Sequence, residues 1–271
     1  MVPPGVAAGG RTIEGMSTIF IMPNDGAVKM RIFREPERKS SVNGKKQKGH
    51  GVMNRKKDII KSIQEISGSR SPYDVFQDWV KCMALAIQNS CYFFHDNIWK
   101  KREDEYLKTI APYGKDVYKI QDMTCMLVET MEEGLGDILG EIYMESKLGN
   151  KSTGQFFTPF SVSYMCAKIN LANLKDTNKQ ISLHEPTCGS GGMILASAKA
   201  LKDEGINYQR KMSVTAQDLD WKAVYMCYVQ CSFYGVRAVV VQGDTLSEPF
   251  TEQHYPPERV FYTPAKMGLL I

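Results

Sequence analysis

Residues 185–192, which read Glu-Pro-Thr-Cys-Gly-Ser-Gly-Gly, constrain the fold more than any other part of the chain. Residues 180–184 before them alternate in polarity as a short strand does, and residues 193–201 after them are rich in Ala and Leu at helical spacing. The glycines let the backbone turn sharply and come into contact with a ligand, because no Cβ atom blocks the approach. A strand, a glycine turn and a helix in this order predict an α/β fold with a cofactor site, and the alternative is a tight turn that binds nothing.

The spacing of the glycines counts against two common phosphate-binding sites. A dinucleotide-binding turn needs a third glycine where Ile194 stands, and a P-loop needs Gly-Lys followed by Ser or Thr. The interval from the turn to Asp218 is roughly thirty residues, against about twenty in the dinucleotide-binding fold. Both spacings therefore disfavour a nicotinamide-dependent oxidoreductase.

Two further predicted strands end in carboxylates. Residues 213–217 are predicted to form a strand that ends at Asp218, and residues 238–242 a strand that is followed by Asp244. Carboxyl ends of parallel strands meet at one edge of a sheet, so we expect both acids to lie beside Glu185. Asp218 is then placed to accept hydrogen bonds from ribose hydroxyls, and Asp244 from an adenine amino group. Each acid alone has an alternative role as a helix cap or turn residue.

Four motifs follow one another along the chain in a specific order. They are Gly-Gln-Phe-Phe-Thr-Pro at 154–159, the glycine turn, Ala-Gln-Asp-Leu-Asp at 216–220 and Gly-Asp-Thr-Leu at 243–246. Upstream, Asp-Ile-Leu-Gly at 137–140 and Tyr143 precede the first motif. Together these segments resemble the modification subunits of type I restriction systems, a family of adenine-N6 DNA methyltransferases.

The resemblance implies a Rossmann-like methyltransferase sheet and the cofactor S-adenosyl-L-methionine. It implies that Phe157 and Thr158 flank the methionine end of the cofactor. Glu185 and the glycine turn are implied to hold the methionine moiety, Asp218 the ribose and Asp244 the adenine. The implied cofactor-binding residues are Phe157, Thr158, Glu185, Thr187, Gly189, Gly191, Asp218 and Asp244.

The segment after the predicted fourth strand, residues 259–262, departs from the family. There the methylases carry Asn-Pro-Pro followed by Phe or Tyr, which bind the amine of the flipped base and stack on its ring. This chain has Thr263, Pro264, Ala265 and Lys266 instead. A flipped adenine needs these contacts, because extruding it costs energy that the pocket must return. We therefore expect a truncated sheet, without the later strands or a target-recognition region, that transfers methyl groups poorly or not at all as this chain alone.

Positive charge is concentrated near the amino terminus. Residues 29–61 contain twelve Lys or Arg and three acids, a net charge of +9, whereas the whole chain carries +4. Residues 17–22 and 28–33 around an Asp-Gly turn predict a β-hairpin. Residues 38–57 are typical of a flexible basic linker, which either contacts nucleic-acid phosphates or carries no function. We assign residues 1–70 to this basic segment.

Helical periodicity begins at Ser71-Pro72, a pair suited to start a helix, and further helices are predicted at 99–110, 117–131 and 137–146. We expect a helical domain at 71–150 and a partial S-adenosylmethionine-binding methyltransferase domain at 151–271. By the resemblance, the helical domain helps to hold DNA and a specificity subunit. Its methionine-rich strip from Met123 to Met131 is expected to pack in the core.

Composition excludes several other classes. No apolar run approaches the roughly 20 residues of a membrane span, and no signal-peptide pattern is present, so we expect a cytoplasmic protein without membrane contact. The seven cysteines lack paired Cys-x-x-Cys spacing, so neither a disulfide framework nor a metal site is expected. Cys227 and Cys231, four residues apart on a predicted helix, are expected to pack in the core.

Two functions from different classes follow. The first is an S-adenosylmethionine-binding protein of the adenine-N6 DNA methyltransferase family that is impaired or inactive in methyl transfer as this chain alone. The alternative is a non-catalytic cofactor-binding or regulatory partner of a restriction-modification complex. The expected partners are DNA and a specificity subunit or another methylase subunit.

Overall fold

The computed structural model describes residues 19–24, 27–32, 52–68, 70–92, 94–146, 156–172, 179–251 and 255–269. Strands β1 (Ile19–Asn24) and β2 (Ala27–Ile32) pair antiparallel, with Asn24 opposite Ala27, so the predicted hairpin is confirmed. The turn at residues 25–26 lies outside the described residues, as does the predicted linker up to residue 51.

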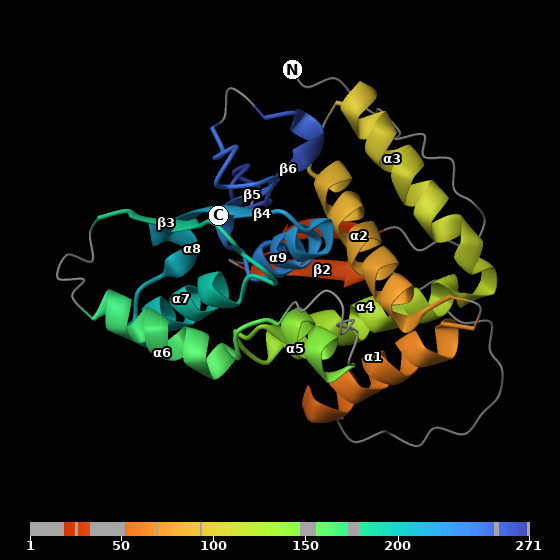
Figure 1. Ribbon diagram of the computed structural model, residues 1–271, viewed down its shortest axis with the longest axis horizontal. Coiled ribbons are helices and arrows are strands. Elements are labelled where there is room, and N and C mark those ends of the chain that lie inside the picture. The colour runs from red at the N-terminus through yellow and green to blue at the C-terminus, as the bar shows by residue number, and fades with distance from the viewer. Residues whose placement is uncertain are drawn as a thin grey trace.

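The amino-terminal half of the described chain is helical (Figure 1). Its elements are α1 (Val52–Ile66), α2 (Pro72–Ser90), α3 (Asn97–Ile110), the 3-10 helix η1 (Ala111–Asp116), α4 (Val117–Glu132) and α5 (Ile138–Glu145). Ser71 caps α2 as predicted: its hydroxyl accepts a hydrogen bond from the Asp74 amide at 3.1 Å, and the Asp74 carboxylate accepts one from the Ser71 amide at 3.3 Å. The strip on α4 is buried at Met123, Leu127 and Met131, as predicted.

Helix α1 corrects the linker prediction for residues 52–57. Ile59, Ile63 and Ile66 recur on one helical face and are buried in the core, and their burial stabilises the helix. The Arg55 side chain pairs with Glu129 of α4 at 3.0 Å, and Lys56 pairs with Glu141 of α5 at 2.5 Å. Two cations of the predicted linker therefore help to hold α1 on its neighbours.

The carboxyl-terminal half contains a four-stranded sheet in the order β3-β4-β5-β6. Its elements are α6 (Phe160–Leu171), β3 (Ile181–Glu185), α7 (Gly192–Asp203), α8 (Tyr208–Lys211), β4 (Met212–Asp218), α9 (Trp221–Phe233), β5 (Arg237–Gln242), the 3-10 helix η2 (Pro257–Arg259) and β6 (Val260–Tyr262). Strands β3, β4 and β5 are parallel; α7 and α8 connect β3 to β4, and α9 connects β4 to β5. The predicted fold class, a helical region followed by a Rossmann-like α/β sheet, is confirmed.

Strand β6 forms at the predicted position but runs antiparallel to β5. Val241 lies opposite Val260, and Val239 lies opposite Tyr262. The end of β6 therefore lies near the beginning of β5, away from the carboxyl ends of the parallel strands.

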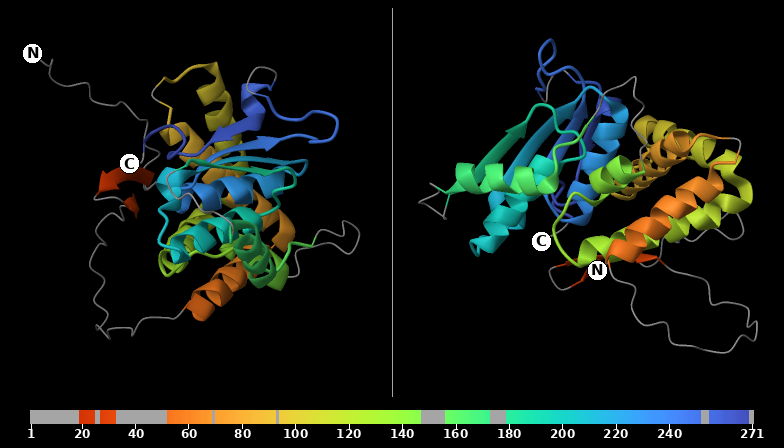
Figure 2. Two further views of the ribbon diagram at one scale, coloured as in Figure 1. Left: turned by 90° about the vertical axis from the view of Figure 1, so that its left-hand side faces the viewer. Right: turned by 60° about the horizontal axis from the view of Figure 1, so that its bottom comes forward.

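One cluster of buried hydrophobic residues runs through both halves of the described chain. It includes Trp79 of α2, Tyr143 of α5, Tyr228 of α9 and Phe261 of β6. Helix α9 packs against α2 on one side and against β5 on the other, and Figure 2 shows the strands beside the helical elements. The domain boundary at residue 150 stays a prediction, because the core does not divide there.

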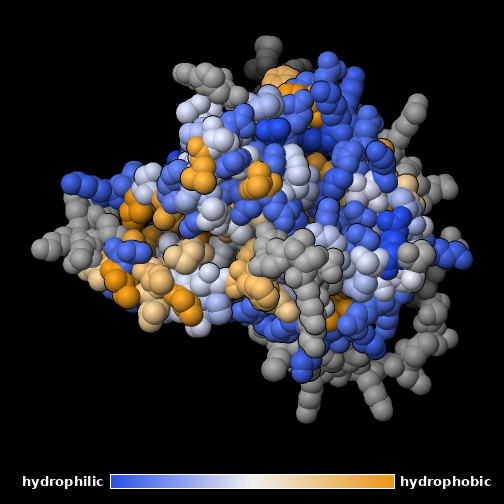
Figure 3. Space-filling model, in the orientation of Figure 1, coloured by the Kyte–Doolittle hydropathy of each residue, from blue (hydrophilic) through white to orange (hydrophobic). Residues whose placement is uncertain are grey.

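The surface of α6 is apolar over part of its length. Val162, Met165 and Ile169 are exposed at helical spacing, and hydrophobic side chains gather in this region in Figure 3. In the described part of the chain, no helix is long and apolar enough to cross a membrane. The cysteines, all within the described residues, form no disulfide, and Cys227 and Cys231 are buried in the core as predicted.

Candidate functional site

The glycine turn joins β3 to α7 and adopts backbone conformations that favour glycine. Gly189 has a φ of 53° and Gly191 a φ of 97°, both in the left-handed region. A Cβ atom on Gly189 would lie 3.0 Å from the Phe157 ring, and one on Gly191 would lie 3.3 Å from the Cys227 sulfur. The turn is therefore sharply bent, as the glycine pattern predicts, and its glycines also pack closely against Phe157 and Cys227.

Asp218, at the end of β4, fixes the front of this turn. Its Oδ2 accepts a hydrogen bond from the Gly189 amide at 2.8 Å, and its Oδ1 accepts one from the Asp220 amide at 2.9 Å. Burial raises the pKa of Asp218, and these two backbone bonds offset part of the rise. The carboxylate is half-buried at the edge of the sheet and retains lone pairs for a further donor.

Glu185 ends β3 on the same edge, paired in register with Ala216 of β4. Its carboxylate is half-buried, and burial raises its pKa. The amide of Thr187, an exposed residue, approaches Glu185 Oε1 at 3.5 Å, which is a long contact. A cationic group placed here would find a carboxylate with little competition from the protein.

The segment after β5 completes this edge. The Gly243 amide donates to the Asp218 carbonyl at 2.9 Å, and the Thr245 hydroxyl donates to the Pro186 carbonyl at 2.6 Å. Asp244 between them is exposed, and the backbone amide of Leu246 lowers its pKa. The structure thus brings Glu185, Asp218 and Asp244 to one edge of the sheet, as the sequence predicts.

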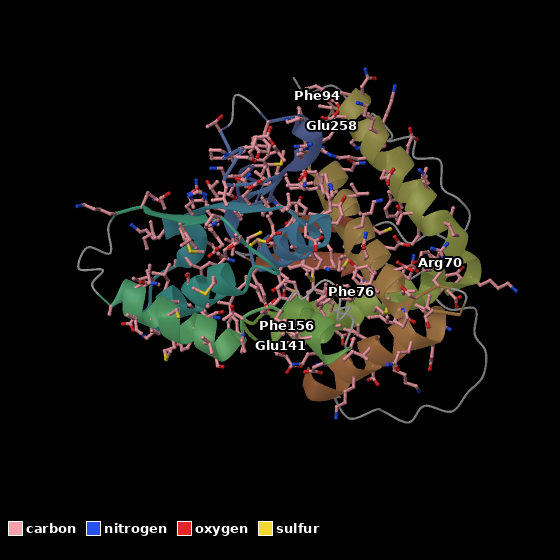
Figure 4. The ribbon with its side chains drawn as sticks, in the orientation of Figure 1. Arg70, Phe76, Phe94, Glu141, Phe156 and Glu258 are labelled. Atoms are coloured by element: carbon pink, nitrogen blue, oxygen red, sulfur yellow. The ribbon has the colours of Figure 1, made fainter. Side chains whose placement is uncertain are left out.

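Phe157 connects this edge to the helical half. Its ring lies against Gly189 and packs on Tyr143 of α5, with centroids 5.3 Å apart. Thr158, next to it, is exposed before α6 begins. Residues 154–155 of the same motif lie outside the described residues. Figure 4 labels the neighbouring Phe156, which is an exposed side chain.

Thr263 and Pro264 lie away from this edge. The buried Thr263 hydroxyl donates to the Val236 carbonyl at 2.7 Å and accepts from the Ala238 amide at 3.0 Å. These partners are at the start of β5, and the strand rises about 3.3 Å per residue, so Thr263 is about 15 Å from the edge that holds Asp218. Both bonding capacities of the hydroxyl are used inside the protein.

Sequence reasoning did not identify the residues that support the site from behind. Lys222, at the start of α9, donates to the Tyr143 hydroxyl at 3.0 Å and lies 3.3 Å from the Asp220 carboxylate. Asp137, which precedes α5, is buried and accepts a hydrogen bond from Ser190 in the glycine turn. The Asp-Ile-Leu-Gly segment resembles the family but does not reveal these contacts, because contacts over such sequence separations leave no periodic signal. No cluster of three or more His, Cys, Asp or Glu in the described residues is arranged to hold a metal ion.

Comparison with known proteins agrees with this geometry. The model of the N-6 DNA Methylase family matches residues 134–265, which include the glycine turn and all three carboxylates. A type I restriction enzyme methylase subunit (MpnII) from Mycoplasma pneumoniae is 26% identical over 214 residues, which are 73% of this chain and 38% of that protein. The MjaIX methylase subunit from Methanocaldococcus jannaschii is 26% identical over 140 residues, covering 45% of this chain and 23% of that protein. This chain therefore spans well under half the length of these relatives.

Two solved structures show a more distant similarity. One is a class I S-adenosylmethionine-dependent methyltransferase from Listeria monocytogenes, with a TM-score of 0.42 and 14% identity over 75% of this chain and 56% of that one. The other is a type I restriction-modification methyltransferase subunit from Streptococcus thermophilus, with a TM-score of 0.36 and 15% identity over 75% of this chain and 55% of that one. Over the part that holds the site, the chain resembles the N-6 DNA methylases and, among them, the methylase subunits of type I restriction enzymes.

Proposed function

We propose that the edge formed by β3, β4 and β5 binds S-adenosylmethionine. The observation that carries this proposal is the presence of carboxylates at three successive strand ends around a glycine turn with left-handed backbone. In this proposal Phe157 and Thr158 lie at the methionine end of the cofactor. Asp218 accepts from the ribose hydroxyls, and Asp244 accepts from the adenine amino group.

The chemistry of Glu185 supports the fit of this cofactor. The α-amino group of the methionine moiety is a cation, and Glu185 offers a half-buried carboxylate whose contact with the Thr187 amide is long. Thr187, Gly189 and Gly191 shape the turn beside it, because the two glycines permit its left-handed backbone. The bound cofactor would supply an activated methyl group.

We further propose that this chain alone transfers methyl groups poorly or not at all. Methyl transfer to adenine requires hydrogen-bond acceptors for the target amine and a stacking surface for the flipped base. The segment that corresponds to this motif by resemblance has Thr263 and Pro264, and the Thr263 hydroxyl is bonded to β5. That this chain shares the activity, the DNA substrate and the partner subunits of its longer relatives is likewise a proposal.

A calorimetric titration of the chain with S-adenosylmethionine tests the cofactor proposal. We expect saturable binding that Asp218→Ala weakens by about tenfold or more, since hydrogen bonds to a charged group contribute about 1.5–3 kcal/mol. Asp203→Ala is the matched control, because this surface carboxylate of α7 binds Tyr164 and Lys199 away from the site. Absence of binding by the unaltered chain at about 1 mM ligand would contradict the proposal.

The second candidate function is a non-catalytic partner that binds the cofactor within a restriction-modification complex. The engaged Thr263 hydroxyl favours this candidate, since a binding partner needs no target-base pocket. Copurification with a methylase or specificity subunit, with activity only in the mixture, would support it. Methyl transfer to DNA by this chain alone would contradict it.

The cytoplasmic location stays a prediction.

A further inference from the structure

Asp137 does more than cap the helix that follows it. Its Oδ1 accepts a hydrogen bond from the Gly140 amide at 3.0 Å, which is an ordinary cap for α5. Asp96 caps α3 in the same way, accepting from the Trp99 amide at 2.8 Å, yet Asp96 is exposed. Asp137 is only 3% exposed. A cap alone does not require such burial, which is costly for a carboxylate.

The additional partners of Asp137 come from the glycine turn and from α9. The Ser190 hydroxyl donates to Asp137 Oδ2 at 2.5 Å, and Gln230 Nε2 donates to Asp137 Oδ1 at 2.8 Å. Gln230 Nε2 also donates to the Ser190 carbonyl at 2.8 Å, while its Oε1 accepts from the Leu139 amide at 3.0 Å. These bonds form a closed network that joins α5, the turn and α9.

The network contacts the middle of the glycine turn. Ser190 lies between Gly189 and Gly191, the two residues with left-handed backbone. A Cβ atom on Gly192 would lie 3.1 Å from Asp137 Oδ2, so the carboxylate is packed directly against the turn. Asp218 holds the Gly189 amide from the front, and Asp137 holds Ser190 from behind.

The donors to Asp137 in the described part of the chain are neutral groups from three separate segments. Burial raises the pKa of Asp137, and the bonds from Gln230 and Ser190 offset part of that rise. A buried carboxylate of this kind is stable only while its donors remain in place. The position of the turn and the position of α5 are therefore linked.

We infer that Asp137 is a positioning residue that holds the glycine turn in its ligand-binding shape and so makes ligand binding depend on α5. This inference rests on the proposed function for the ligand, S-adenosylmethionine, but its effect on the turn exists without the ligand. Asp137 acts through Ser190 and need not touch the ligand.

The test compares Asp137→Asn and Ser190→Ala with two matched controls in the full chain. Asp96→Asn makes the same change at the cap of α3, and Ser197→Ala removes a hydroxyl of α7 that donates to the Met193 carbonyl. Hydrogen exchange of the amides at 188–192 is measured without ligand. Affinity for S-adenosylmethionine is measured calorimetrically at a temperature where every variant is folded.

We expect Asp137→Asn and Ser190→Ala each to speed exchange in the turn and to weaken binding by about tenfold, the loss of one charge-assisted hydrogen bond. The double variant should bind about as weakly as Asp137→Asn alone, because both substitutions remove the same interaction, the hydrogen bond from Ser190 to Asp137. The controls should change neither property. If Asp137→Asn does not fold, Ser190→Ala against Ser197→Ala decides the question.

Unchanged exchange and affinity in Ser190→Ala and Asp137→Asn would overturn the inference, as would equal effects in the controls. If the unaltered chain does not bind S-adenosylmethionine, the proposed function fails. In that case, faster exchange confined to the turn in the two variants would still support the positioning role of Asp137.

Discussion

Gly191 shows how single residues determine the shape of the site. Its left-handed φ excludes most side chains, and its close approach to Cys227 excludes even a methyl group without movement. Buried Cys227 is thus a packing surface for the turn, consistent with the sequence expectation that it has no metal or redox role. The pattern of glycines was sufficient to predict a turn here, because the requirement is local to the backbone.

Gly191→Ala should lower the free energy of unfolding more than Gly205→Ala does. Gly205 has a φ of 74°, but a Cβ atom there would meet nothing within 4 Å, so that substitution adds only backbone strain of about 1 kcal/mol. At Gly191 we expect about 1–2 kcal/mol more, because the methyl group also presses on Cys227. Urea unfolding of both variants measures the difference. Equal losses would show that packing against Cys227 contributes nothing.

At the scale of elements, β6 marks the limit of what the sequence predicts. The pattern at residues 259–262 indicates a strand, but a short apolar run looks the same in either direction. Its direction depends on contacts distant in sequence, such as those of Thr263 with Val236 and Ala238. The three parallel strands were more predictable, since each is joined to the next through a helix and each ends in a carboxylate.

Thr263→Val should destabilise the protein without changing ligand affinity. Valine has nearly the same shape but leaves the buried Val236 carbonyl and Ala238 amide without their partner, at a cost of about 1–3 kcal/mol. Affinity should stay the same because Thr263 lies at the opposite edge of the sheet from Asp218. Thr245→Val is the comparison, since Thr245 bonds to Pro186 beside the site. Weaker binding by Thr263→Val with full stability would contradict the observed strand direction.

At the scale of the whole molecule, the two halves share one core. Phe76 of α2 packs against Tyr143, which in turn packs against Phe157 at the site. The sequence suggested separate domains because helical patterns fill residues 71–150, whereas the predicted strands of the sheet begin only at residue 180. Periodicity describes each element alone, whereas the packing of α2 on α9 depends on which faces meet. The contact between Asp137 and Ser190 was unpredictable for the same reason.

A shared core predicts that both halves unfold together. Phe76→Leu should lower the free energy of unfolding by about 1–3 kcal/mol. The unfolding transitions followed by far-ultraviolet circular dichroism and by tryptophan fluorescence should both move to the same lower urea concentration. Phe94→Leu is the control, because Phe94 is 80% exposed and surface changes rarely exceed about 0.5 kcal/mol (Figure 4). Added S-adenosylmethionine should raise both transitions equally, because a ligand that binds only the folded state stabilises every part that unfolds with its site. If the ligand raised one transition and left the other in place, the helical half and the sheet would be independent units despite their common core.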